Sequence, residues 1–245
     1  MDKISVINLN PATLGEQEEL ARVIYAAYRQ CYSKDTADNL MYNGKHIKDI
    51  YKFIQTCMDK GHLSPLEHIS VTFAINGVPR AITHQLVRHR MASYSQQSQR
   101  YNEMEGVEIE DVVYLPEDVI EYLKFHGWYD VIYKTLAVYH HMIDDGIPKE
   151  NARFILPEGT RSNLVMTANL RSWLNICNQR LCGSAQDEIR EVIGLVGTKL
   201  ITMFPFLEGF VGPKCIRSDK CLDGKNKGEL CEEHYAWRDE PWGFL

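Results

Sequence analysis

The sequence of 245 residues lacks several features that would assign it to other classes of protein. It has no apolar run of the roughly 20 residues that a membrane-spanning helix needs. Its first residues lack the apolar core of a secretory signal peptide, so we expect a cytoplasmic protein. Internal repeats and low-complexity tracts are also absent. The seven cysteines are an odd number scattered along the chain, which is typical of reduced thiols rather than of a disulfide framework.

Basic residues are too few for a general nucleic-acid binder, because the formal net charge is −6 and a nucleic-acid footprint is broadly basic. We therefore expect neither a nucleic acid nor a membrane as a partner. Hydrophobic residues make up 44% of the chain and charged residues 24%, as in ordinary globular proteins. We expect one domain over residues 1–212, followed by a Cys- and His-containing tail over residues 213–245.

One stretch, residues 88–101, differs from the acidic average. Between Glu67 and Glu103 there is no acidic residue and no lysine, yet four arginines fall there. A planar guanidinium suits phosphate and fixed carbonyl oxygens. The stretch also holds three serines and three glutamines. Their neutral hydrogen-bond donors and acceptors suit a site that binds both a phosphate and the polar edge of a heterocycle. The alternative is an exposed anion-binding or RNA-binding loop.

Periodicity and turn signals predict an α+β fold in which an antiparallel sheet is flanked by long helices. We expect a turn at Asn76-Gly77, a capping box at Ser184, and Asn169 as the cap of the helix that follows it. The expected helices cover 16–32, 46–60, 81–89, 116–145 with an interruption at Gly127 as an alternative, 170–181, and a last helix after Ser184. The expected strands cover 4–9, 69–75, 107–114 and 163–168.

Three spaced motifs resemble those of the flavin-dependent thymidylate synthases. Arg88-His89-Arg90, then seven residues, then Ser98, followed by Arg100-Tyr101, is similar to the signature of that family. His62, Ser64 and Glu67 match its His-x-Ser/Thr-x-x-Glu-His element. Residues 153–157 and 169–180 match Arg-x-x-Leu-Pro and Asn-x-Arg-Ser-x-x-Asn-x-x-x-x-Arg. The resemblance covers about residues 31–180. The chain departs from the family pattern at Ser95-Gln96, where members often carry Asn-Glu, and at Gln99, where glycine is usual.

The resemblance implies an enzyme that methylates dUMP to dTMP with FAD, NADPH and 5,10-methylenetetrahydrofolate. It implies a homotetramer with sites where subunits meet, which would explain why the flavin needs no Gly-x-Gly-x-x-Gly loop. By position it implies flavin-binding roles for His62, Ser64, Glu67, Arg88, His89, Arg90, Gln96, Asn169, Arg171 and Asn175. Likewise it implies substrate-binding roles for Gln85, Arg88, Gln96, Gln97, Ser98, Gln99, Arg100, Arg153 and Arg180.

Arg180 is the predicted catalytic residue. No motif supports a cysteine that adds to C6 of the uracil, so the alternative is to polarise the ring. The resemblance places Arg180 at the uracil edge, where a fixed cation would stabilise developing negative charge. Ser98 has no evident His-Asp relay, and we interpret it as nucleotide-binding. Cys31, which the resemblance places near the flavin, has no paired base and is not a predicted nucleophile.

The tail holds Cys215, Cys221, Cys231 and His234. Only Cys231-x-x-His234 has a chelating spacing, so zinc binding and a reduced peripheral tail both remain open, and no metal is predicted at the active site. Two other functions compete with the synthase. A non-catalytic nucleotide- or RNA-binding protein would use the arginines but leaves the motifs at 62–67 and 169–175 unexplained. A different flavin enzyme on the same fold is the second.

Overall fold

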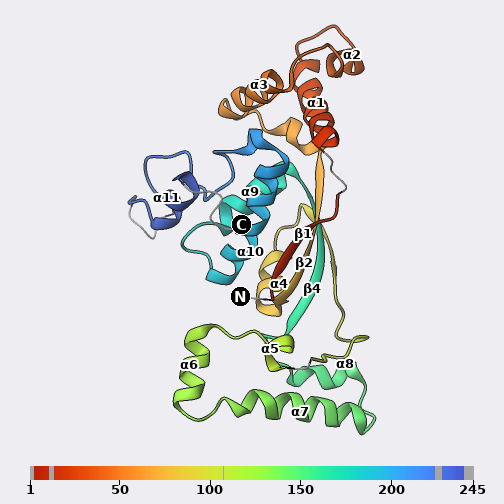
Figure 1. Ribbon diagram of the computed structural model, residues 1–245, viewed down its shortest axis with the longest axis vertical. Helices are drawn as coiled ribbons and strands as arrows, with labels where there is room; N and C mark the ends of the chain where they lie inside the picture. Colours follow the sequence, from red (N-terminus) through yellow and green to blue (C-terminus); the bar gives the residue numbers. More distant parts are fainter. Residues whose placement is uncertain (1–2, 11–13, 107, 224–227, 240–245) are drawn as a thin grey trace. The chain divides into compact units, whose positions relative to one another are not determined.

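The computed structural model describes residues 3–10, 14–106, 108–223 and 228–239 (Figure 1). The strands are β1 (Ser5–Asn8), β2 (Ser70–Pro79), β3 (Ala92–Gln96) and β4 (Arg161–Asn169). The α-helices are α1 (Leu14–Gln30), α2 (Ala37–Met41), α3 (Ile47–Asp59), α4 (Arg80–Leu86), α5 (Ile109–Val112), α6 (Glu117–Phe125), α7 (Asp130–Asp144), α8 (Lys149–Ala152), α9 (Leu170–Arg180), α10 (Asp187–Met203) and α11 (Glu232–Asp239). Short 3-10 helices are η1 (Ser64–His68), η2 (Arg153–Ile155) and η3 (Pro205–Leu207). Within the described ranges no helix is long and apolar enough to cross a membrane.

The chain divides into two compact units, and each is described by itself. The first unit contains Met1–Ser5, Ala74–Arg88 and Tyr94–Val165. The second unit contains Val6–Phe73, His89–Ser93 and Met166–Leu245. Strands β2 and β4 each have residues in both units. The predicted site residues are also divided between the two units. A single domain over 1–212 stays a prediction.

The sheet has the strand order β1-β2-β4-β3, with β1 at an edge as predicted. In the second unit, Leu170 N donates to Ile69 O at 2.9 Å, and the hydroxyls of Thr72 and Thr167 lie 2.9 Å apart. Because the residue number rises along β2 while it falls along β4, these strands are antiparallel. The predicted mixture of helices and an antiparallel sheet is therefore confirmed.

The core of the second unit follows the predicted apolar faces. Alternation that begins one residue before β2 buries Ile69, Val71 and Phe73. On α10 every apolar residue of the predicted face is buried: Ile189, Val192, Ile193, Val196 and Leu200. The cap of α9 is also as predicted, because Asn169 Oδ1 accepts from Ser172 N at 2.8 Å.

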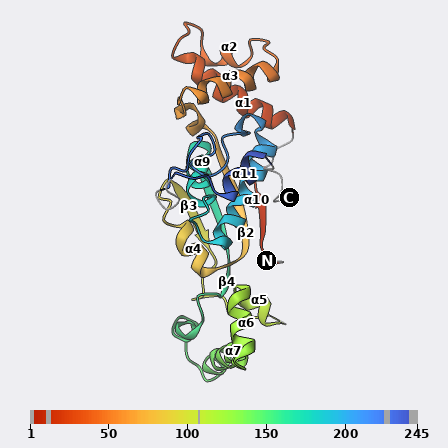
Figure 2. The same ribbon diagram turned by 90° about the vertical axis from the view of Figure 1, so that its left-hand side faces the viewer.

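Helices α5 to α8 belong to the first unit (Figures 1 and 2). Residues of α5, α7 and α8 and of the neighbouring loops form a small core there. Tyr139 of α7 is fully buried there, with Met104, Val112, Val113 and Ala152 around it. Its phenol accepts from Met104 N at 3.3 Å. The helical stretch expected over 116–145 is two helices, α6 and α7, separated at Gly127. That glycine has a φ of 67°, which few other residues adopt.

Strand β3 was not among the expected strands, and three further local predictions are wrong. Residues 108–114 are not a strand: α5 occupies Ile109–Val112, and its start is closed by a reciprocal pair of bonds between Glu108 and Asp111. Val107, the first residue of the predicted strand, lies outside the described residues. There is no turn at Asn76-Gly77, because β2 continues to Pro79. Gly77 has a φ of 70°, and an added Cβ would collide with the carbonyl oxygen of Lys3. Finally, Gln186 rather than Ser184 precedes α10, without a side-chain capping bond.

Candidate active site

In the second unit, the first and last arginine-containing motifs meet at one hydrogen bond. Arg180, the last residue of α9, donates from Nε to Nε2 of His89 at 2.9 Å. His89 is only 8% exposed. Burial first, and the charge of Arg180 second, lower the pKa of His89 from 6.5 to about 4. The imidazole is therefore neutral near pH 7, accepts at Nε2, and carries its proton on Nδ1.

The same unit brings the Glu67 and Arg171 motifs together. Helix η1 packs against α9, and Arg171 Nη1 forms an ion pair with Glu67 Oε1. Each of these side chains is about half exposed, so both remain accessible to a ligand. The pair links the start of α9 to the loop of the second motif. Asn175, one turn further along α9, accepts from Gln179 Nε2 at 3.2 Å.

Three more predicted flavin-binding residues of the second unit lie at the surface. His62, Ser64 and Arg90 are all exposed. The carbonyl of His62 is fixed by the hydroxyl of Tyr28, which donates to it. Burial raises the pKa of Tyr28 well above 10, so that hydroxyl keeps its proton. The His62 backbone is thus anchored, while its imidazole is exposed.

In the first unit, Gln96 shows what an amide does at a position where the motif that it resembles implies a glutamate. Its Nε2 donates to Thr83 Oγ1 at 3.0 Å and to Ser162 Oγ at 3.2 Å. These bonds join β3 to α4 and β4. A carboxylate could only accept from the same hydroxyls, so their protons would have to reorient. The amide nitrogen of Gln96 therefore serves the fold, in addition to any ligand role.

Gln97 and Ser98 are held by backbone groups of the first unit. Gln97 N donates to Asn163 O at 2.8 Å, and Gln97 Oε1 accepts from Asn163 N at 3.3 Å. Ser98 Oγ accepts from Arg100 N at 3.2 Å, and the carbonyl of Ser98 accepts from Asn102 N at 3.0 Å. Ser98 thus forms a tight turn that presents Gln99 and Arg100, consistent with its interpretation as a binding residue.

Gln99 and Arg153 line one pocket of about 310 Å³ in the first unit. Gln99 is buried, and its Nε2 has no hydrogen-bond partner within the described chain. Arg80 and His84 line the same pocket, although the sequence did not single them out as site residues. The available signal was that Arg80 is one of the four arginines in the acid-free run. Glu158 also lines the pocket, with its Oε2 at 3.7 Å from His84 Nδ1. The two guanidinium groups outnumber this one carboxylate, and with the buried donor they suit an oxygen-rich anion.

Arg100 is paired within its own unit. Its Nε and Nη2 donate to Glu150 Oε2 at 2.8 and 2.7 Å, and the hydrogen bond raises the pKa of the guanidinium. Arg153 Nε also donates to the carbonyl of Glu150, at 3.2 Å. Glu150 therefore joins two predicted substrate-binding arginines. Gln85 is half-buried on α4 and Arg88, two residues after that helix ends, is exposed.

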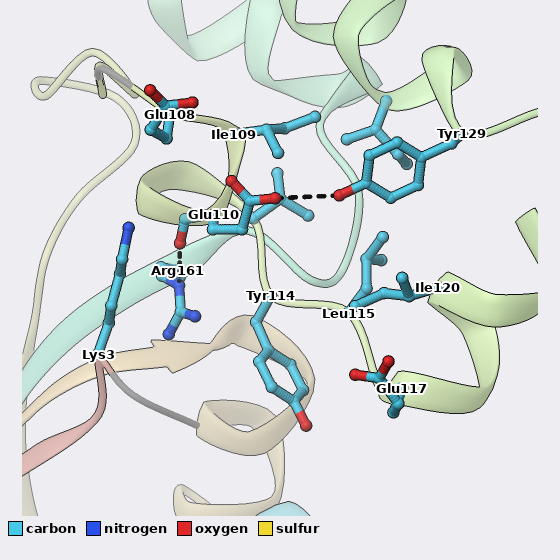
Figure 3. A pocket seen from close by; sticks show the side chains of 12 residues that line it. Lys3, Glu108, Ile109, Glu110, Tyr114, Leu115, Glu117, Ile120, Tyr129 and Arg161 are labelled. Carbon is cyan, nitrogen blue, oxygen red and sulfur yellow. Dashed lines mark hydrogen bonds between the residues drawn. The ribbon is translucent and has the colours of Figure 1, made fainter. Parts of the chain in front are cut away.

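A second pocket of the first unit, about 420 Å³ in volume, contains none of the predicted site residues (Figure 3). Glu108, Glu110 and Glu117 line it, and Tyr129 donates to the Glu110 carboxylate at 3.0 Å. Arg161 also lines it, but its Nε donates to the carbonyl of Glu110 at 2.8 Å. Three carboxylates disfavour a nucleotide phosphate, so we do not assign this pocket to the active site.

Comparison with known proteins identifies the family. The family model described as thymidylate synthase complementing protein matches residues 13–206, which includes every motif above. The chain belongs to the flavin-dependent thymidylate synthase family. Relatives of that name are 37% identical in Pyrococcus furiosus, over 71% of this chain and 73% of the relative, and 36% identical in Geobacter sulfurreducens, over 87% and 91%. One from Nitratidesulfovibrio vulgaris is 34% identical, over 86% and 90%.

A solved structure resembles the fold. It is a UMP/dUMP methylase from Streptomyces cacaoi bound with 5-Br dUMP, with a TM-score of 0.65 and 24% sequence identity. The match covers 83% of this chain and 92% of that chain. At this identity the likeness concerns the fold alone, and the individual roles of the site residues remain predictions.

Proposed function

We propose that this chain methylates dUMP to dTMP, with 5,10-methylenetetrahydrofolate as carbon donor and NADPH-reduced FAD as reductant. We also propose that it works as a homotetramer with its sites where subunits meet. The observation that carries the proposal is the contact of Arg180 with a neutral His89, in a chain whose residues 13–206 match the family. Two motifs separated by 91 positions meet where the proposed chemistry needs a fixed cation.

The side chains of the second unit fit a flavin dinucleotide. FAD presents a pyrophosphate, which needs cations, and an isoalloxazine edge, which needs hydrogen-bond donors and acceptors. Arg90 and Arg171 are exposed or half-exposed cations, and His62 and Asn175 offer further hydrogen-bonding groups. Asn169 uses its oxygen to cap α9, which leaves its amide nitrogen as a donor. When bound, reduced FAD would supply the hydride that completes the methyl group.

The role of Arg180 follows from the electronics of uracil. C5 becomes nucleophilic only when negative charge can develop on the ring and its carbonyl oxygens. A guanidinium fixed at that edge lowers the energy of the charged state more than that of the neutral ring. His89 orients Arg180 without cancelling its charge, because the imidazole is neutral. Arg180 is therefore the catalytic residue in this proposal and His89 a positioning residue.

The pocket of Gln99 and Arg153 suits the nucleotide phosphate. Its guanidinium groups would bind the phosphate oxygens, and the buried Gln99 amide would gain a hydrogen bond that it lacks in the described chain. Arg80 joins the predicted residues in this role.

The experiment is an anaerobic spectroscopic titration of the purified protein. We expect oxidised flavin bands that NADPH bleaches, and that return only when dUMP and methylenetetrahydrofolate are both added. Replacing dUMP with UMP tests whether the enzyme distinguishes deoxyribose from ribose. A colourless protein that cannot be reconstituted with FAD would favour a non-catalytic nucleotide- or RNA-binding protein. Reoxidation without dUMP would favour a different flavin enzyme.

A further inference from the structure

The tail that follows η3 returns to the end of α9 and to α10, all within the second unit. Lys214 N donates to Asn178 O at 2.9 Å. Arg190 Nη1 forms an ion pair with Glu233 Oε1 at 3.3 Å. Trp237 of α11 is buried so close to Gly197 that a Cβ there would lie 2.9 Å from its ring. The tail is thus a packed part of the unit, and α11 lies beside α10.

Four of the seven cysteines gather where the tail meets the loop after α9. The Cys182 thiol lies 3.9 Å from Asp223 Oδ2, and Asp223 N donates to Cys221 Sγ at 3.3 Å. A Cβ on Gly183 would lie 3.3 Å from Cys231 Sγ, which brings that thiol beside the neighbour of Cys182. These contacts bring together residues far apart in sequence, and they add Cys182 to the tail cysteines that the sequence analysis considered.

Cys215 belongs to the same cluster. It is buried, and its chain neighbour Lys214 donates a backbone hydrogen bond to Asn178 O near the end of α9. His234 adds an unsatisfied polar atom: it is 1% exposed, and its Nδ1 has no hydrogen-bond partner within the described residues. It follows Cys231 by one helical turn. Neighbouring thiols beside a buried, unpartnered imidazole are better explained by an ion than by apolar packing.

We propose that Cys182, Cys215, Cys221 and Cys231 bind one zinc ion, which fastens the tail to the end of α9. Four thiolates are a common ligand set for structural zinc, and soft sulfur ligands disfavour magnesium and calcium. Binding releases the thiol protons and involves no oxidation or reduction. We assign His234 as a hydrogen-bond donor to one of the ligating sulfurs, the usual role of a polar group behind the ligands.

The thiols lie near one another but do not yet converge. As the side chains stand, no three His, Cys, Asp or Glu residues in the described part of the chain are arranged to hold an ion. Zinc–sulfur bonds of about 2.3 Å therefore require the thiols to rotate inward. Cys182 lies two residues after Arg180, so the ion would also stabilise the end of the helix that carries the predicted catalytic arginine.

The test measures metal in the full chain, purified without chelators from zinc-supplemented cells. We expect about one zinc ion per chain by inductively coupled plasma mass spectrometry. A mercurial reagent that reacts with the thiols should release this zinc. Cys182→Ser and Cys221→Ser should lose at least nine tenths of the zinc. Cys57→Ser, in α3 and outside the cluster, is the matched control and should retain it. None of these readouts depends on flavin or on catalysis.

A second measurement keeps the proposal falsifiable if the serine variants do not fold. The wild-type protein, stripped of metal and loaded with cobalt, should show thiolate-to-cobalt charge-transfer bands and the intense visible bands of a tetrahedral ion. A zinc-free wild-type protein that takes up no cobalt would overturn the proposal. So would a disulfide between two of the four cysteines in non-reducing peptide mapping, or equal loss of zinc in the Cys57 control.

Discussion

Two predicted site arginines, Arg100 in the first unit and Arg180 in the second, are held in opposite ways. Arg100 makes two bonds to the carboxylate of Glu150 at an exposed position. Arg180 donates to an imidazole that burial keeps neutral. A carboxylate partner offsets the charge of a guanidinium, whereas a neutral acceptor orients it without doing so.

The difference separates two uses of the same side chain. A charge that must stabilise a transition state has to be fixed in place before the reaction and still act on the substrate. The contact with His89 meets both conditions. The contact with Glu150 mainly orders the loop around the turn at Ser98, and it leaves Arg100 a weaker binding group. The predictions below test this contrast.

The largest effect is expected from Arg180→Lys. Lysine keeps the positive charge but loses the planar fork, so we expect kcat for dTMP formation to fall roughly 10²- to 10³-fold, the cost typical of removing a transition-state donor. Arg100→Lys is the matched control and should lower kcat less than about tenfold. The flavin spectrum of both variants should be unchanged. Equal losses of kcat in the two variants would contradict the contrast.

The neutrality of His89 predicts a pH dependence of stability. Its folded pKa of about 4 lies below its ordinary 6.5, so between these values the unfolded chain binds a proton that the folded chain does not. The free energy of unfolding should therefore fall as the pH falls from about 6.5 to 4, by roughly 3 kcal/mol at most, with no further loss from this group below pH 4.

Urea unfolding of the wild type and of His89→Gln at several pH values measures this term. Glutamine can still accept a hydrogen bond from Arg180 but does not titrate. We expect the variant to lose less stability than the wild type across that window. Parallel pH profiles would show that His89 is not kept neutral by the fold, and Arg180 would then face a charged partner.

The parts of the fold that the sequence predicts are those where local chemistry and tertiary packing agree. Alternation that begins one residue before β2 produced the buried face of Ile69, Val71 and Phe73, and Asn169 caps α9 as its residue type suggests. The sequence predicts no strand at β3, because serine and glutamine have little strand propensity. Its neighbour Gln97 bonds to Asn163, so pairing with a distant strand outweighs local preference.

Gly77 shows why one residue type can mislead. Asn-Gly is a good turn signal, but here the positive φ of the glycine lies inside β2 and admits the close approach of Lys3. Motifs in the sequence predicted Glu67 and Arg171 as site residues, and the structure brings these two side chains together in an ion pair. Arg80 and His84 were not predicted, because only folding brings them to the pocket of Gln99.

A smaller effect is expected at the Glu67–Arg171 pair. If these side chains bind the flavin as a unit, Glu67→Gln and Arg171→Gln should each weaken FAD binding by roughly tenfold, about 1.4 kcal/mol. The double variant should lose clearly less than the product of the single effects, because the two residues share one interaction. Fluorescence titration of the apoprotein with FAD measures all four affinities. Additive losses would mean that the residues act independently.

The smallest effect is expected from Glu150→Gln, which tests the Arg100 side of the contrast. The ion pair is exposed, so its loss should not measurably change the thermal midpoint. A neutral amide competes less with phosphate for the guanidinium, so we expect KM for dUMP to fall about two- to threefold, with kcat unchanged. The fall should shrink as salt is added, because exposed charges are screened. Steady-state kinetics at low and high ionic strength measures both. If KM rises instead, Glu150 positions Arg100 for the nucleotide, and both arginines are then oriented for the substrate by a fixed acceptor.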